Sequence, residues 1–417
     1  MARQPLIAEP PVAEPPVAAV RGVPLPIDEA GSAKVALVHD WCPAFRGGER
    51  VAARLAGLLN VRNVYTLFDF LPDAVKNEHF PDLTFHTSVA NGLPGIERYY
   101  RALFFACPFL IEQFDVTAYD VVVSSSAAFA RGVLTRPEQP HLCYVHSPAR
   151  YAWDEQFSYL GQAKLGYGPL GLPIRYMLHG LRTWDTRTAH GPDLMLANSR
   201  YVQSRIRRIY GRDARVVHPP VPTDDIPFVD AKDDYFVTAS FLVPYKRVDL
   251  VVRAFNAMPS RRLVVVGEGP DLAALRALAG PNVTFAGHLP RKQFVRVMAE
   301  AQAMVFAGCE DFGITMAEAQ ACGTPLIAFE RGGANDIVRT LGSSERPTGL
   351  LFREQSEAAI IAAVEHFDEC RGRILPEFCA TSAARFSVER FDQAILQAFE
   401  DVRALNRERL SAPPDLD

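Results

Sequence analysis

Two acidic residues, Glu310 and Glu318, stand at a spacing that suits the binding of a carbohydrate. Glu310 opens EDFGI, a compact turn after the apolar run 303–308, and Glu318 follows in a helical pattern. Carboxylates accept hydrogen bonds from hydroxyl groups, so the pair can hold two hydroxyl-rich parts of one ligand. Acidic residues near a helix start are also common as caps, so the pair alone does not establish a site.

Residues suited to binding a diphosphate follow two other apolar runs. Lys246 and Arg247 come after the run 235–240, at the expected start of a helix. Positive charge there opposes the helix dipole at a cost on the order of a few tenths of a kcal/mol, which favours a binding role over a solvated basic pair. Gly47-Gly48 opens the first helix, where bare backbone amides can face an anion, although glycine pairs also occur in ordinary turns.

A histidine and a second glycine pair also follow apolar runs. His146 ends the run 141–146 and is followed by Ser147 and Pro148, a position from which it can touch a ligand. A lone histidine is more often structural, so this signal is weak by itself. Gly332-Gly333 follows the run 325–329 and forms another turn with exposed backbone.

The apolar runs that precede these residues alternate with helical patterns along the body of the chain. Nearly continuous apolar runs of this length are typical of strands covered on both faces of a parallel sheet. The expected strands are 35–40, 63–68, 83–86, 119–125, 141–146, 193–198, 235–240, 262–268, 282–287, 303–308, 325–329 and 349–352. Ligands bind beyond the carboxyl ends of such strands, so the candidate residues are expected to face one cleft.

The pattern predicts two α/β domains of similar size. They are residues 33–217 and 229–386, joined by the linker 218–228, which holds four prolines in 11 residues. Residues 387–411 form a closing helix that is long enough to cross back to the first domain. Residues 1–32 carry seven prolines in the first 26 positions and are expected to be a disordered tail without the features of a secretory signal.

Composition and charge narrow the class of protein. Of the 417 residues, 48% are hydrophobic and 22% are charged, as in soluble globular proteins. The longest apolar run, 102–111, is far shorter than the ~18 residues that span a bilayer. The net charge of −4 gives no bulk electrostatic reason to expect nucleic-acid binding. Seven dispersed cysteines without a C-x-x-C pair indicate free thiols in a reducing cytoplasm.

The candidate residues lie in strings that resemble glycosyltransferase family 4. EDFGITMAEAQACGTPLIAFERGGANDIV is similar to the family signature, with its E-x7-E motif at Glu310 and Glu318. RGGER, YVHSPARYAWD, LVPYKRVD and VVGEGPDL fit the same family. The resemblance runs from Lys34 to Phe399 and is closest to bacterial GDP-mannose-dependent mannosyltransferases of polysaccharide assembly.

The resemblance implies a GT-B fold, in which two Rossmann-like, doubly wound α/β domains enclose the active site between them. It also implies retaining transfer of a hexose from a nucleotide-diphosphate sugar, GDP-mannose, to a glycan, including a polyprenyl-diphosphate-linked one. By motif position, Glu318 would bind the ribose hydroxyls. Glu310 would hold the donor hexose together with the backbone of Phe312, Gly313 and Ile314.

The remaining family roles concern the diphosphate and the reacting carbon. Lys246, with Arg247 nearby, would neutralise the diphosphate, and Gly47-Gly48 would face it from the other domain. His146 would contact the donor sugar near the reacting carbon. The resemblance therefore makes His146, Lys246 and Glu310 the expected catalytic residues.

The chain departs from the family pattern at Phe241, where many members carry an arginine, so the diphosphate loses one bidentate partner. Either Arg247 takes over that contact or the donor binds more weakly. The D-x-D motif of many metal-dependent transferases occurs only at 415–417, in the terminal tail. We therefore expect basic residues and helix ends to stabilise the leaving group, with no metal and no cofactor.

The residues that would bind the acceptor are harder to predict from the sequence. The segment 96–105, IERYYRALFF, mixes aromatic and basic residues in the first domain. It is either a membrane-facing surface or a buried helix whose arginines extend to solvent. The first alternative places the protein in the cytoplasm, peripherally on the inner face of the plasma membrane.

Other functions remain open at this point. A nucleotide-sugar-binding protein without catalysis is favoured by Phe241 alone. A sugar-nucleotide epimerase of GT-B architecture is the nearest enzymatic rival. A dinucleotide-dependent oxidoreductase is disfavoured because none of the glycine turns that follow the expected strands reads G-x-G-x-x-G.

Overall fold

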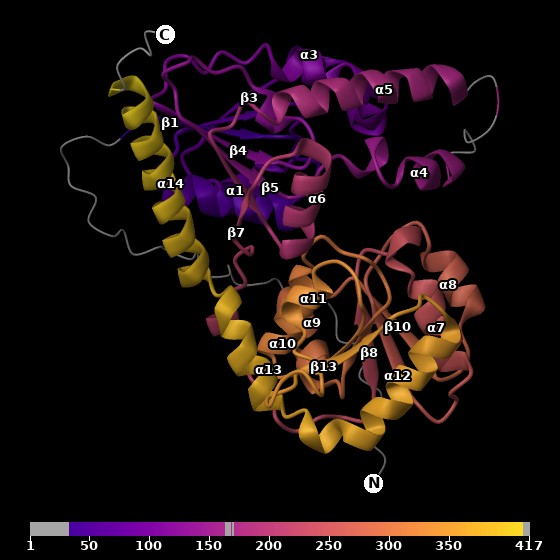
Figure 1. Cartoon of the computed structure of the whole chain (residues 1–417). Coiled ribbons are helices and arrows are strands. Elements are labelled where there is room, and N and C mark those ends of the chain that lie inside the picture. Colours follow the sequence, from indigo (N-terminus) through magenta and orange to yellow (C-terminus); the bar gives the residue numbers. More distant parts are fainter. Residues whose placement is uncertain (1–32, 163–167, 169–170, 412–417) are drawn as a thin grey trace.

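The computed structural model describes residues 33–162, 168 and 171–411, and the predicted tail 1–32 lies outside them. Two β-sheets form two halves of the molecule, and helices pack around each (Figure 1). Every strand that pairs within a sheet does so in parallel. The predicted architecture of two parallel α/β units is therefore confirmed.

The first sheet has seven strands in the order β3-β2-β1-β4-β5-β6-β7. They are β1 (Val35–His39), β2 (Asn63–Thr66), β3 (Thr84–Thr87), β4 (Val121–Ser126), β5 (His141–Val145), β6 (Leu194–Ala197) and β7 (Arg215–Val216). Each strand expected in this half is present. The sequence does not predict β7, because a strand of two residues is too short to show a pattern of apolar residues.

The second sheet has six strands in the order β10-β9-β8-β11-β12-β13. They are β8 (Phe236–Ala239), β9 (Leu263–Val266), β10 (Val283–Gly287), β11 (Met304–Phe306), β12 (Leu326–Phe329) and β13 (Gly349–Phe352). All of them lie within the apolar runs of the sequence.

Helices cover both sheets. Those between strands of the first sheet are α1 (Gly47–Leu58), α2 (Asp73–His79), α3 (Cys107–Ile111), α4 (Gln156–Gln162), α5 (Gly171–Thr188) and α6 (Arg200–Tyr210). Those of the second half are α7 (Val248–Asn256), α8 (Leu272–Leu278), α9 (Arg291–Glu300), α10 (Ile314–Ala321), α11 (Ala334–Ile337), α12 (Glu357–Cys370) and α13 (Pro376–Ala383), and α14 (Val388–Ser411) closes the chain. Short 3-10 helices include η2 (Ile96–Arg98), η3 (Tyr100–Phe105), η5 (Arg150–Ala152) and η7 (Pro244–Lys246).

Burial on both faces explains the continuous apolar runs. All five residues of β1 are buried. Val35 and Leu37 join one core cluster, whereas Ala36 and Val38 join another. Alternate side chains of a strand point to opposite faces, so both faces of this sheet are covered by apolar side chains.

The closing helix α14 connects the two halves. It begins beside the second half and runs along the first, as Figure 1 shows in yellow. Phe391, Ile395 and Phe399 pack into the core of the first sheet. The linker crosses in the other direction alongside it, because Val221 N donates to Phe386 O at 2.9 Å.

The segment 96–105 is not the helix that one of the two alternatives requires. It forms η2 and η3, with Ile96 and Tyr100 buried and with Tyr99 and Phe105 exposed. In the part of the chain that the structure describes, no helix has the length and apolar character needed to cross a bilayer. All seven cysteines are free, as the sequence predicts.

Candidate active site

A cavity of about 290 Å³ lies between the two halves, at the carboxyl ends of their strands. All predicted site residues except Arg247 and Glu318 line it. The first half contributes Gly47, Gly48, Val51, His146 and Asn198, and the second contributes Ala239, Ser240, Phe241, Lys246, Phe306 and the segment 310–316. Residues far apart in the sequence therefore converge on one interdomain space, as expected for parallel sheets.

Lys246 and Glu310 form an ion pair in this cavity. The Lys246 ammonium contacts the Glu310 carboxylate, and both side chains are largely buried. Gly308 allows the close approach, because a Cβ at this position would lie 3.0 Å from both Cα and the carbonyl oxygen of Lys246. The site thus holds one cation and one carboxylate side by side, each of which is a group that binds part of a sugar diphosphate.

Arg247 points elsewhere. Its backbone adopts a left-handed conformation, with φ of 53°, at the start of α7. Its Nε donates to Asp249 Oδ1 at 3.2 Å, and Arg247 is not among the residues that line the cavity. The structure therefore gives no support to the expectation that Arg247 replaces the arginine missing at position 241.

Arg46 is a basic residue near the cavity that the sequence does not predict as part of the site. Its guanidinium lies 4.2 Å from the centre of the Phe241 ring, and Phe241 lines the cavity. An arginine stacked on an aromatic face keeps its donors free for an anion. The only sequence signal for it is its place next to Gly47, in RGGER.

The glycine pair after β12 contacts the backbone of the EDFGI turn on the side away from the cavity. Gly333 N donates to Glu310 O at 2.9 Å, and Glu310 pairs with Gly332 in a short parallel bridge. A Cβ at Gly333 would lie 2.0 Å from Phe312 O. The glycines do not line the cavity, so their role differs from the ligand-facing turn suggested by the sequence: they let two backbone segments meet.

Glu318 lies in the second turn of α10 and is almost completely buried. Arg291 Nη1 lies 2.9 Å and Arg50 Nη1 lies 3.4 Å from its Oε1. Arg50 belongs to the first half and Arg291 to the second. The two arginines therefore fix the carboxylate beside the cavity rather than on its wall.

His146 stands at the end of β5, where the sequence places it. Its Nε2 lies 2.7 Å from Ser125 Oγ, and its carbonyl oxygen accepts a hydrogen bond from Asn198 Nδ2 at 2.8 Å. Burial, with a smaller contribution from His39, lowers the pKa of His146 to about 3. The imidazole is therefore neutral near pH 7 and can contact a hydroxyl group without adding charge.

Lowering the pH should destabilise the protein through its buried histidines. Burial also lowers the pKa of His141 to about 3, so in the folded protein neither His141 nor His146 takes up a proton until far below the value of ~6.5 expected in the unfolded chain. The unfolded state binds more protons in this window, so stability falls as the pH drops from about 6.5 towards 3. Urea unfolding at pH 7.5 and at pH 5.5 measures the loss.

The control for this prediction is His141→Leu, which removes one of the two imidazoles. The variant should show a smaller difference in urea midpoint between the two pH values than the wild type, whatever its absolute stability. Equal midpoints of the wild type at both pH values would contradict the prediction.

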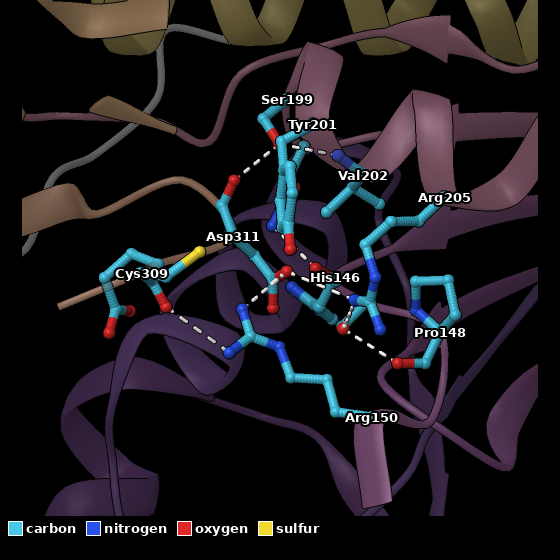
Figure 2. Close-up of polar contacts among 12 residues, drawn as sticks. His146, Pro148, Arg150, Ser199, Tyr201, Val202, Arg205, Cys309 and Asp311 are labelled. Carbon is cyan, nitrogen blue, oxygen red and sulfur yellow. Dashed lines mark hydrogen bonds and ion pairs between the residues drawn. The ribbon is translucent and has the colours of Figure 1, made fainter. Parts of the chain in front are cut away.

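Figure 2 shows the polar contacts that side chains of the first half make with the EDFGI turn and with Cys309 before it. Arg150 Nη2 lies 2.7 Å and Arg205 Nη1 lies 3.4 Å from Asp311 Oδ1. Ser199 Oγ donates to Asp311 O at 2.5 Å, and Arg150 Nη1 donates to Cys309 O at 3.4 Å. The residues on either side of Glu310 are therefore held by side chains of the opposite domain. The sequence does not predict this cluster, because Arg150 and Arg205 are more than a hundred residues from Asp311.

Models of two transferase families match successive parts of the chain. The model described as Glycosyltransferase Family 4 matches residues 45–225, and the one described as Glycosyl transferases group 1 matches residues 224–384. Together the matches cover the strands from β2 to β13, the linker and every residue of the candidate site, whereas β1 precedes them.

Curated relatives share part of this sequence. A GDP-mannose-dependent alpha-(1-6)-phosphatidylinositol monomannoside mannosyltransferase of Mycolicibacterium smegmatis is 31% identical over 193 residues, which cover 39% of this chain and 50% of the relative. A D-inositol 3-phosphate glycosyltransferase of Mycobacterium marinum is 31% identical over 167 residues, covering 37% of this chain and 36% of the relative. The chain thus spans half or less of the length of these relatives.

Solved structures share the fold at low sequence identity. HepE of Anabaena in complex with UDP has a TM-score of 0.64 at 16% identity, covering 88% of this chain and all of that one. Sucrose-phosphate synthase of Thermosynechococcus elongatus has a TM-score of 0.70 at 20% identity, covering 89% of this chain and all of that one. With two Rossmann-like domains and the two models matched one after the other, this chain consists of a Glycosyltransferase Family 4 domain followed by a Glycosyl transferases group 1 domain, arranged in the GT-B fold.

Proposed function

We propose that this protein is a retaining, metal-independent mannosyltransferase that moves mannose from GDP-mannose to a glycan acceptor in polysaccharide assembly. The observation that carries the proposal is the convergence of Lys246, Glu310 and His146 on one interdomain cavity. The choice of donor is supported by the name of the Mycolicibacterium smegmatis relative, which uses GDP-mannose. HepE of Anabaena is described with UDP, so the base requires its own test.

The proposed roles follow from the charges in the cavity. The diphosphate of the donor replaces Glu310 as the partner of Lys246, because a diphosphate carries more negative charge than one carboxylate. Glu310 is then free to accept hydrogen bonds from the hexose hydroxyls. Backbone amides at the start of α10, from Phe312 to Ile314, face the same ligand.

Departure of the nucleotide leaves extra negative charge on the diphosphate. Lys246, the start of α1 at Gly47-Gly48 and the Arg46 guanidinium supply positive potential in a cavity that the two domains enclose. Glu318, fixed by two arginines, accepts hydrogen bonds from the ribose. The neutral His146 contacts the hexose hydroxyl nearest the reacting carbon, and we assign no enzymic nucleophile.

Donor turnover tests this function directly. Release of nucleotide from GDP-mannose, UDP-glucose and ADP-glucose is measured with and without a glycan acceptor, in buffer containing EDTA. We expect GDP release from GDP-mannose to be fastest, to rise with acceptor and to be unchanged by EDTA, because fixed cations stabilise the leaving group. A requirement for added manganese, or faster release from a UDP-sugar, would overturn the respective part of the proposal.

We further propose that the protein works on the inner face of the plasma membrane. The supporting observation is a group of exposed aromatic side chains on η3, α3 and the preceding turn: Tyr99 is 40%, Phe105 53% and Phe109 63% exposed. Aromatic side chains near basic ones favour the lipid headgroup region. Tyr100, which the sequence places in the same group, is buried and belongs to the core.

Vesicle sedimentation tests the membrane contact. Replacing Tyr99, Phe105 and Phe109 together by serine should reduce partitioning onto anionic phospholipid vesicles by at least ~10-fold, because three aromatic rings no longer enter the interface. Leu375→Ser, which alters an exposed apolar residue of the second half, should have no effect. Equal sedimentation of the triple variant and the wild type would rule out this surface.

A further inference from the structure

A second cavity, of about 600 Å³, lies next to the candidate active site. Its walls come from η5, α4, α5 and α6 of the first half and from the loop after β12 in the second half. The side chains that line it include Trp153, Arg182, Tyr201, Arg205, Arg208 and Arg331. We call this space the basic cavity.

The basic cavity carries an excess of positive charge. Four arginines line it, whereas Asp154 is its single acidic residue and is already paired with Arg205 Nη2 at 2.5 Å. Within the ranges that the structure describes, Arg208 and Arg331 are exposed and form no ion pair or side-chain hydrogen bond. Two guanidinium groups, one from each half, therefore have all their donors available to a ligand.

Arg205 provides a second, independent sign of a ligand. Its side chain is 92% buried, Nη1 donates to Ser147 Oγ at 2.7 Å, and Nε has no hydrogen-bond partner among the described residues. A buried donor without a partner is unfavourable, and a bound anion would satisfy it.

Aromatic rings complete the wall. Trp153 Nε1 donates to the buried Asp185 Oδ2 at 2.7 Å, which fixes the indole ring. Tyr201 and the exposed Phe157 lie along the same cavity. Sugar rings and apolar chains pack on aromatic faces, so the cavity offers an apolar surface beside its cations.

The basic cavity adjoins the cavity of the candidate active site, called the donor cavity from here on. Asp311 lines the donor cavity and lies 3.4 Å from Arg205, which lines the basic cavity (Figure 2). A ligand held here lies beside the place where the donor hexose is expected.

We infer that the basic cavity binds the phosphate or diphosphate group of a phosphorylated acceptor, an inference that rests on the proposed transferase function. Arg208 and Arg331 contact the phosphate oxygens from opposite domains, and Arg205 forms the floor. The acceptor sugar then lies between Trp153 and the donor cavity. Because the ligand contacts both halves, its binding also favours the closed arrangement of the domains.

Calorimetric titration with inorganic pyrophosphate and with farnesyl diphosphate tests the inference. Both titrations use Lys246→Ala as the parent protein, because this change weakens diphosphate binding in the donor cavity. Adding Arg208→Ala and Arg331→Ala to this parent should weaken binding at least ~10-fold for each arginine removed, since charge-assisted hydrogen bonds are lost. Adding Arg207→Ala instead removes an equal charge from the same helix outside the cavity and should leave the dissociation constant unchanged.

The outcomes distinguish a lipid-linked phosphate from a water-soluble one. They also test the basic cavity separately from the proposed transferase function. Tighter binding of farnesyl diphosphate than of pyrophosphate supports a lipid-linked acceptor, and equal binding supports a water-soluble phosphate ester. Equal weakening by Arg207→Ala, or no weakening by the loss of Arg208 and Arg331, overturns the inference. Release of GDP from GDP-mannose in the presence of a glycan acceptor is measured in parallel with the wild type: its absence counts against the proposed donor function, whereas the titrations still decide whether the basic cavity binds phosphate.

Discussion

Replacing Lys246 by alanine is expected to lower kcat by at least ~10²-fold, the loss seen when one preorganised donor to a developing negative charge is removed. Lys246 is the one ammonium group on the wall of the donor cavity, and it is held in place by Glu310. No other group of the described cavity wall can bring a full positive charge to the same point. Steady-state kinetics with GDP-mannose measure the effect, with thermal unfolding to establish that the variant is folded.

Two neighbouring arginines serve as graded controls. Arg46→Ala should lower kcat/KM by about 10-fold, because the guanidinium stacked on Phe241 adds positive potential at the cavity edge. Arg247→Ala should change it by less than about 3-fold, because this side chain is paired with Asp249 outside the cavity. Wild-type kinetics for Lys246→Ala, or an equally large loss for Arg247→Ala, would remove Lys246 from its assigned role.

Gly333→Ala is expected to cause the second large loss, although Gly333 touches no ligand. The added Cβ would lie 2.0 Å from Phe312 O, so the EDFGI turn has to move. A displacement of about 1 Å in a positioning element costs on the order of 10²-fold in kcat/KM. Overpacking of two backbone segments also lowers the free energy of unfolding by about 1–3 kcal/mol.

Gly57→Ala is the matched control for this substitution. Gly57 lies in α1, and an added Cβ there meets nothing within 4 Å. The variant should keep wild-type activity and gain up to about 1 kcal/mol of stability, because alanine favours the helix. Wild-type activity of Gly333→Ala, measured with the same assay and with urea unfolding, would show that the glycine pair does not position Glu310.

Ion pairs hold the charged side chains of the candidate site, and the donor is expected to separate only the pair of Lys246 and Glu310. Lys246 is paired with Glu310, and Glu318 is paired with Arg50 and Arg291. These contacts keep the charged side chains in place before the donor arrives, which reduces the reorganisation needed on binding. Because Arg50 and Glu318 come from different halves, we expect donor binding and domain closure to be coupled at this point.

The sequence predicts the sheets well because burial leaves a strong local pattern. Runs such as 35–40 and 235–240 are apolar on both faces, and the structure confirms a strand in each. The short β7 and the 3-10 segment 96–105 leave no such pattern, and their structure depends on contacts with distant residues.

The candidate site was predictable to the extent that each residue follows a strand. His146, Lys246 and Glu310 do so, and the parallel topology brings them to one cavity. Contacts between the halves are not encoded by local spacing. The contact of Arg46 with Phe241 and the ion pair of Arg150 with Asp311 join residues more than 150 positions apart. The close approach of Gly333 to Phe312 becomes evident only when the two backbone segments are placed together in the structure.

A crystal structure of the protein soaked with GDP-mannose tests the central claim most directly. We predict that the diphosphate lies within hydrogen-bond distance of the Lys246 ammonium, with the mannose against Glu310 and the EDFGI turn in the interdomain cavity. A donor bound outside this cavity, or a cavity without donor at saturating concentration, would contradict the proposed function.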